Sequence, residues 1–81
     1  MIENVKNLLW WLGTGHYHVA NCGKYCLYHG ENGGGYDEIP EKVLEEASKK
    51  GYFTKTKNGK SWDYHITYEG TKAAVKEYYV L

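Results

Sequence analysis

Sulfur and imidazole side chains are concentrated in one short stretch of the chain, and zinc prefers both as ligands. Within residues 16–29, HYHVANCGKYCLYH, the group comprises His16, His18, Cys22, Cys26 and His29. Their spacing is not that of a zinc finger, and in a helix the last four would extend over roughly 16 Å. One ion could not reach them all. We therefore expect ordinary core or surface roles for these residues and no bound metal.

The same segment raises the question of catalysis, because a thiol beside an imidazole can act as a nucleophile. No carboxylate that could orient the imidazole stands out in the sequence, and neither does an oxyanion hole. A chain of 81 residues also leaves little room for a pocket. We expect the protein not to be an enzyme and to need no cofactor.

The apolar segments of the chain are all short. The longest, residues 8–12, is far below the ~20 residues that span a bilayer. The first residues lack the basic and apolar regions of a signal peptide. We expect a cytoplasmic protein without membrane contact, in which Cys22 and Cys26 are thiols.

Positive charge comes from lysine alone and is unevenly distributed. The net charge is −3 for residues 1–41 and +3 for residues 42–81, and the chain has no arginine. Three lysines, Lys55, Lys57 and Lys60, cluster in the stretch TKTKNGK. Such a cluster could bind the phosphates of a nucleic acid, or it could keep an exposed strand edge soluble.

Three segments are predicted to be helices that position these residues in one domain covering residues 1–81. Apolar residues at helical spacing give residues 2–12 and residues 39–50 a face for the core. Pro40 suits the first position of the second helix, where its missing N–H costs nothing. Residues 68–79 form the last helix, for which Thr67 is a suitable N-cap.

A β-hairpin is predicted around Asn58-Gly59, because a type I′ turn needs positive φ at both central positions. With these two residues as the loop, Lys55 pairs with Trp62 and Phe53 with Tyr64. One face of the hairpin then carries the apolar side chains of Phe53, Trp62, Tyr64 and Ile66. The other face carries the polar side chains of Thr54, Thr56, Ser61, Asp63 and His65. The apolar face is expected to pack inward.

The segment between the first two helices is harder to assign. Residues 16–29 have a weak apolar face and are predicted to form a second N-terminal helix, with a hairpin turning at Cys22-Gly23 as the alternative. The glycine-rich residues 30–36 are predicted to be a loop, and they lack the Gly-Lys-Ser/Thr of a phosphate-binding loop. The expected fold class is α+β: N-terminal helices, a further helix, a two-stranded hairpin and a C-terminal helix.

Residues 39–75, about half the chain, resemble the second half of winged-helix domains. Lys50-Gly51-Tyr52-Phe53 is similar to the exit from the recognition helix, and Asn58-Gly59 to the tip of the wing. Ile66-Thr67-Tyr68-Glu69-Gly70 is similar to the passage from the wing into the last helix. The resemblance implies a small winged-helix-like domain, with residues 39–50 as recognition helix.

The resemblance further implies binding to double-stranded DNA, as by a transcriptional regulator from a virus or mobile element. The phosphate contacts would fall to Lys55, Lys57 and Lys60, with Lys42 and Lys49 near the groove. The alternative is a protein-binding module on the same scaffold, such as a viral inhibitor of a host defence complex of the anti-CRISPR type. This alternative is favoured by the absence of arginine and by three acidic side chains on the same helix, Glu41, Glu45 and Glu46.

Trp10 and Trp11 lie off the apolar stripe of the first predicted helix. A helix that is apolar on two sides has a partner on both. These rings are therefore expected either to be covered by residues 16–29 or to form a homodimer or partner interface.

Overall fold

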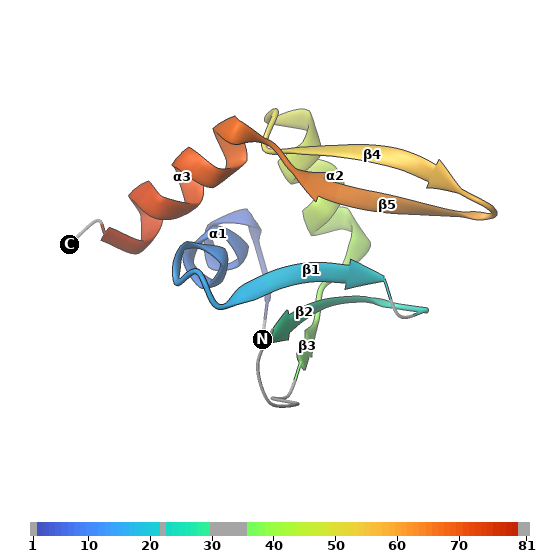
Figure 1. Cartoon of the computed structure of the whole chain (residues 1–81), viewed down its shortest axis with the longest axis horizontal. Coiled ribbons are helices and arrows are strands. Elements are labelled where there is room, and N and C mark those ends of the chain that lie inside the picture. Colours follow the sequence, from blue (N-terminus) through green and yellow to red (C-terminus); the bar gives the residue numbers. More distant parts are fainter. Residues whose placement is uncertain (1, 22, 30–35, 80–81) are drawn as a thin grey trace.

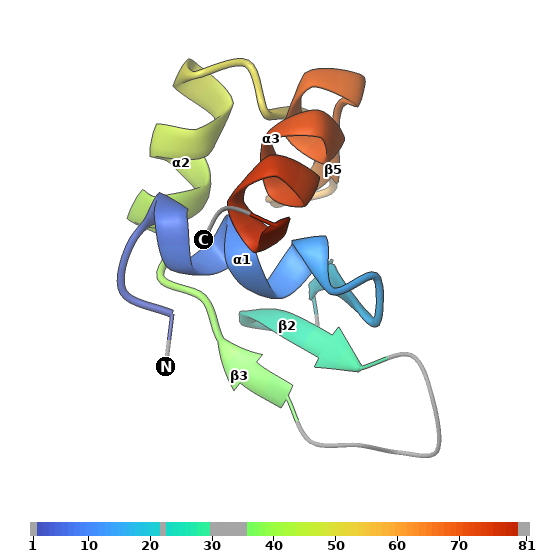
Figure 2. The ribbon, with the colours of Figure 1, turned by 90° about the vertical axis from the view of Figure 1, so that its left-hand side faces the viewer.

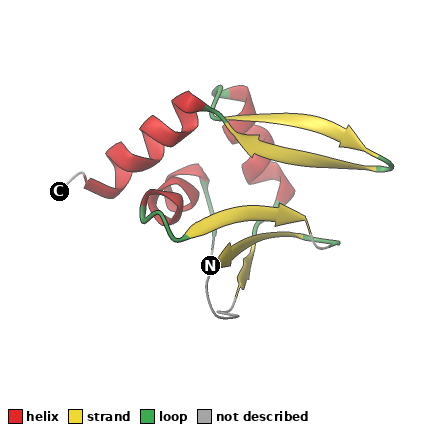
Figure 3. Ribbon diagram, in the orientation of Figure 1, coloured by secondary structure: helices red, strands yellow, loops and turns green. Residues whose placement is uncertain are grey.

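The computed structural model describes residues 2–21, 23–29 and 36–79 and confirms an α+β fold (Figures 1 and 3). The helices are α1 (Val5–Gly13), α2 (Glu41–Lys49) and α3 (Tyr68–Tyr79). The strands are β1 (Tyr17–Asn21), β2 (Tyr25–His29), β3 (Tyr36–Glu38), β4 (Phe53–Asn58) and β5 (Ser61–Ile66). They form two antiparallel sheets, one ordered β1-β2-β3 and the other consisting of β4 and β5. Among the described residues, none of the helices has the length and apolar character to cross a bilayer.

The predicted second N-terminal helix is wrong, because residues 16–29 form the β1–β2 hairpin. Val19 pairs with Leu27 and Asn21 with Tyr25. The Asn21 side chain accepts a hydrogen bond from the backbone N–H of Gly23, whose φ of 91° favours glycine. The segment is rich in aromatic and β-branched residues, which fit a pleated and half-buried surface better than a helix.

The segment after the β1–β2 hairpin also differs from its prediction. Tyr36, expected in the loop, begins β3, which pairs with β2 and places Asp37 opposite Leu27. Residues 30–35 of the predicted loop lie outside the described residues, as does Cys22. Among the described residues before α2, the chain therefore forms one helix, α1, and then the three strands of one sheet.

Both ends of α2 are set by identifiable residues. Pro40 is the N-cap and not the first helical residue, so α2 starts at Glu41. At the other end the N–H groups of Gly51 and Tyr52 bond to the carbonyls of Ser48 and Ala47, 3.0 Å each. This Schellman arrangement requires a residue in the left-handed region, and Gly51 has a φ of 84°. It turns the chain directly into β4.

The β4–β5 hairpin has the predicted faces but a different register. Asn58 pairs with Ser61 and Phe53 with Ile66, so the loop is Gly59-Lys60. Gly59, with a φ of 63°, is the first of the two loop residues, a position at which both type I′ and type II′ turns need a positive φ. Moving the loop by one residue shifts each cross-strand partner by two. Since side chains alternate with a period of two, their faces are unchanged.

The core lies between α1, α2, α3 and the inner faces of the sheets. Its fully buried side chains include Ile2, Leu8, Leu27, Ile39 and Leu44. Helices α1 and α3 lie against each other (Figure 2). A Cβ added at Gly13 would meet the carbonyl oxygen of Ala74, so glycine permits this close crossing.

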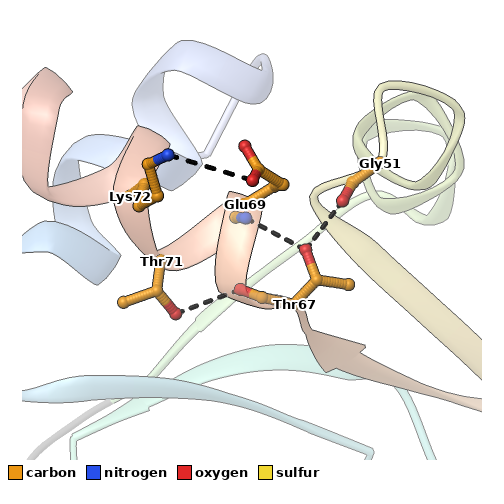
Figure 4. A network of polar contacts seen from close by, with 6 residues as sticks. Gly51, Thr67, Glu69, Thr71 and Lys72 are labelled. Carbon is orange, nitrogen blue, oxygen red and sulfur yellow. Dashed lines mark hydrogen bonds and ion pairs between the residues drawn. The ribbon is translucent and has the colours of Figure 1, made fainter.

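The N-cap predicted at Thr67 is confirmed, and the residue also ties α3 to the end of α2 (Figure 4). Its Oγ1 accepts a hydrogen bond from the N–H of Gly70 at 3.0 Å and donates one to the carbonyl of Gly51 at 2.7 Å. The N–H of Thr67 also donates to the carbonyl of Tyr52, 2.9 Å away. One residue therefore connects the ends of three elements.

Candidate functional site

The three lysines predicted to contact phosphate lie on the outer part of the β4–β5 hairpin. Lys55 and Lys57 are on β4, and Lys60 is in the turn; all three are exposed. In Figure 1 the hairpin extends away from the helices, so its tip stands clear of the core. Among the described residues, no ion pair within 4.0 Å involves any of these three ammonium groups.

Two of these lysines converge on one indole ring, which the sequence analysis did not assign to the site. The Nζ atoms of Lys55 and Lys57 each lie 4.9 Å from the centroid of the Trp62 ring. The observed register explains the arrangement, because Lys57 pairs directly with Trp62 and Lys55 is its diagonal neighbour. A cation held over an indole face is stabilised electrostatically. The ring therefore gathers two positive charges on one face of the hairpin.

The backbone of Trp62 is fixed from the other sheet. The hydroxyl of Tyr25 on β2 donates a hydrogen bond of 2.6 Å to the Trp62 carbonyl oxygen. The Tyr25 ring packs edge-to-face on Tyr64, with ring centroids 5.2 Å apart. Aromatic pairs in this geometry contribute beyond their buried area. The hairpin is therefore tied to β2 at the position where Trp62 pairs with Lys57.

Carboxylates of α2 are close enough to the tyrosine pair to act on it electrostatically. Burial is the main cause that raises the pKa of Tyr64 to about 12, and the negative charges of Glu41 and Glu45 add to it. Burial and the same charges, together with Asp63, also raise the pKa of Tyr25. An acidic zone on α2 therefore adjoins the lysine-bearing hairpin.

The predicted groove-facing lysines are on α2, but at opposite ends of it. Lys42 is in the first turn and Lys49 in the last, and both are exposed. Glu45 and Glu46 are exposed between them in the sequence. The solvent face of α2 therefore has mixed charge, in contrast to the hairpin tip.

The two tryptophans predicted at an interface have different surroundings. Trp11 is half-buried, and its ring contacts that of Tyr17 on β1, with centroids 5.2 Å apart. Trp10 is 42% exposed, and its ring contacts that of Tyr78 on α3, with centroids 5.5 Å apart. Residues 16–29 thus cover one ring, as one of the two expectations had it, while α3 partly covers the other.

The cysteine and histidine residues do not form a metal-binding cluster within the described residues. No group of three or more histidine, cysteine or acidic side chains lies within ligand distance there. Cys26 is buried on β2, whereas His16 and His18 are exposed.

A groove of about 420 Å³ runs between β1, β5 and α3 and was not predicted from the sequence. Apolar side chains such as Leu12, Val19, Ile66 and Val75 line it, together with His18 and His65. Two of the apolar side chains, Ile66 and Val75, are more than 40% exposed. Ile66 was expected on the inward-packing face of the hairpin, but at the end of β5 it is partly exposed and lines this groove instead.

Comparison of the chain with protein-family models, with curated proteins and with solved structures found no match.

Proposed function

We propose that the protein binds nucleic acid through the outer part of the β4–β5 hairpin. The observation that carries the proposal is the cluster of three exposed lysines without carboxylate partners among the described residues, two of them held over Trp62. Ammonium groups that are not neutralised internally can replace the counterions condensed on a phosphate backbone.

The ligand that best fits is double-stranded DNA, with residues 39–75 acting as a winged-helix-like unit. In support, α2 precedes an extended hairpin, α3 follows it, and β1 lies beside β5. Where a winged helix has a second helix before the recognition helix, this chain has the β1–β2 hairpin, followed by β3. On this proposal Lys42 and Lys49 face the groove, and the protein is a small regulator from a virus or mobile element.

Fluorescence anisotropy with a labelled random-sequence duplex at about 50 mM salt tests the proposal. Replacing Lys55, Lys57 or Lys60 by alanine should weaken binding for every sequence. Each replacement should also reduce the slope of log K against log salt by about one unit. In a background with Trp10 and Trp11 changed to phenylalanine, Trp62 is the one remaining indole. Its emission should then change as phosphate draws the lysines from its ring.

Lys6→Ala provides the matched control, because it removes the same charge from α1, away from the hairpin. It should leave the affinity and the salt slope close to those of the unmodified chain. A flat titration up to high micromolar protein would rule out the proposal, and equal effects of all four substitutions would rule out the assigned site.

A protein partner is the second candidate, favoured by the exposed carboxylates of α2. Glu41, Glu45 and Glu46 are all exposed and would repel a polyanion placed against this helix. An inhibitor of a host defence complex would use this acidic face in place of the hairpin. Three results together would support this function: the chain captures a protein from nuclease-treated lysate, Glu45→Lys abolishes the capture, and the chain has no affinity for a DNA duplex.

A further inference from the structure

The solvent-facing side of α3 carries an apolar stripe that the core does not use. Tyr68 is 76% exposed, Val75 is 45% exposed and Tyr79 is 70% exposed. The core side of the helix is formed by Gly70 and Ala74, which are buried. In Figures 1 and 2, α1 lies against one side of α3, and no other described element covers the outer side.

The exposed residues have the spacing of a helix–helix seam. Tyr68, Lys72, Val75 and Tyr79 follow one another at intervals of four, three and four residues. This is the spacing of the a and d positions that pair helices side by side. Lys72 folds back along the stripe, with its Nζ 5.4 Å from the centroid of the Tyr68 ring. Its stem can cover apolar surface while its charge stays in water.

We propose that α3 pairs with α3 of a second copy of this chain, antiparallel and about a two-fold axis. In this arrangement Tyr68 packs on the partner's Tyr79, and Lys72 lies opposite the partner's Val75. The positions flanking the seam then bring Glu69 opposite the partner's Lys76, and the two-fold axis repeats this pair. A parallel arrangement would place Lys72 against the partner's Lys72, and the like charges would repel each other.

The size of the surface sets the strength that this dimer can have. A helix of twelve residues is about 18 Å long, so the seam holds only about three turns of contact on each side. Two tyrosine pairs supply the large rings on which interfaces depend. The pairing should therefore be reversible, with a dissociation constant in the micromolar range or weaker. The inference goes beyond the proposed binding of nucleic acid and does not depend on it.

Charge reversal tests the inference in a way that separates pairing from folding. Glu69→Lys alone and Lys76→Glu alone each place like charges at both flanking pairs. Sedimentation velocity from about 10 µM to 1 mM should show each variant as a monomer where the unmodified chain dimerises. Mixing the two variants in equal amounts should restore a dimer, because each flanking pair then joins opposite charges. Circular dichroism of each variant confirms that α3 is folded.

Two further measurements complete the test. Tyr79→Ser removes an exposed ring at one end of the seam, and it should weaken the dimer at least tenfold without lowering the melting temperature. Trp10→Ala changes the neighbouring exposed aromatic residue of α1 and should weaken it less than Tyr79→Ser. A monomer at every concentration would overturn the inference, as would a dimer that Trp10→Ala abolishes and charge reversal on α3 leaves intact.

Discussion

The buried hydroxyl group of Tyr64 is expected to lower the stability of the fold. Its ring is buried against Tyr25, and its hydroxyl oxygen has no hydrogen-bond partner among the described residues. A buried hydroxyl without a partner loses its hydrogen bonds to water and forms none within the protein, which lowers the free energy of unfolding. Tyr64→Phe should therefore leave the free energy of unfolding at pH 7 unchanged or raise it by about 1 kcal/mol. Urea denaturation measures the difference, and a loss of stability would show that the hydroxyl is bonded.

The same residue should make the fold sensitive to alkali. The pKa of Tyr64 is raised from 10.0 to about 12, so the folded state retains a proton that the unfolded chain has lost between these values. The contribution of Tyr64 to the free energy of unfolding is fully present below pH 10. It is lost as the pH rises toward 12, and the loss is on the order of 2 kcal/mol. Denaturation curves at pH 9 and pH 11.5 measure the fall, and Tyr64→Phe should reduce it. Tyr52→Phe is the matched control, with the fall expected to remain.

At the scale of elements, the turn of the β4–β5 hairpin tests the observed register. Gly59 needs positive φ, so Gly59→Val should cost about 1–2 kcal/mol of stability. Asn58 is a strand residue paired with Ser61, and Asn58→Thr should be tolerated within about 0.5 kcal/mol. Thermal unfolding of both variants distinguishes the registers. With Asn58-Gly59 as the loop, both substitutions would be costly.

The start of α3 depends on Thr67, which both caps the helix and donates a hydrogen bond to Gly51 (Figure 4). Thr67→Ala removes the hydroxyl from both contacts and should destabilise the fold by about 1–2 kcal/mol. Thr67→Ser keeps the hydroxyl and should recover most of the loss. If serine and alanine proved equally destabilising, the methyl group and not the cap would be what matters.

Elements with strong local signals could be predicted from the sequence, and others could not. The bounds of α3 and the two faces of the β4–β5 hairpin follow from periodicity and from a single cap residue. The β1–β2 hairpin was missed because residues 16–29 contain too few apolar side chains to distinguish the two-residue repeat of a strand from the 3.6-residue repeat of a helix. Lys55 and Lys57 were recognisable by charge. Trp62 was not assigned to the site, although both registers place it beside Lys55 and Lys57 on one face, because its ring was expected to pack inward with the apolar side chains.

For the molecule as a whole, the crossing of α1 and α3 joins the two ends of the chain. A Cβ at Gly13 would overlap the carbonyl oxygen of Ala74 and approach the Cβ of Tyr78 within 2.6 Å. Gly13→Ala should therefore cost about 1–3 kcal/mol, although alanine is the better helix former. Calorimetry should show a lower melting temperature with the transition still cooperative. Glu46→Ala, on the exposed face of α2, is the control and should change little.

The position of the β4–β5 hairpin also bears on how this protein can change over evolutionary time. Every residue from 54 to 61 is exposed, whereas Phe53 and Tyr64 anchor the strands in the core. Exposed substitutions of this kind alter stability by only about 0.5 kcal/mol. Apart from the glycine of the turn, mutations can therefore accumulate at the tip with little effect on whether the chain folds. Selection for a new binding target can act there without compensating mutations elsewhere.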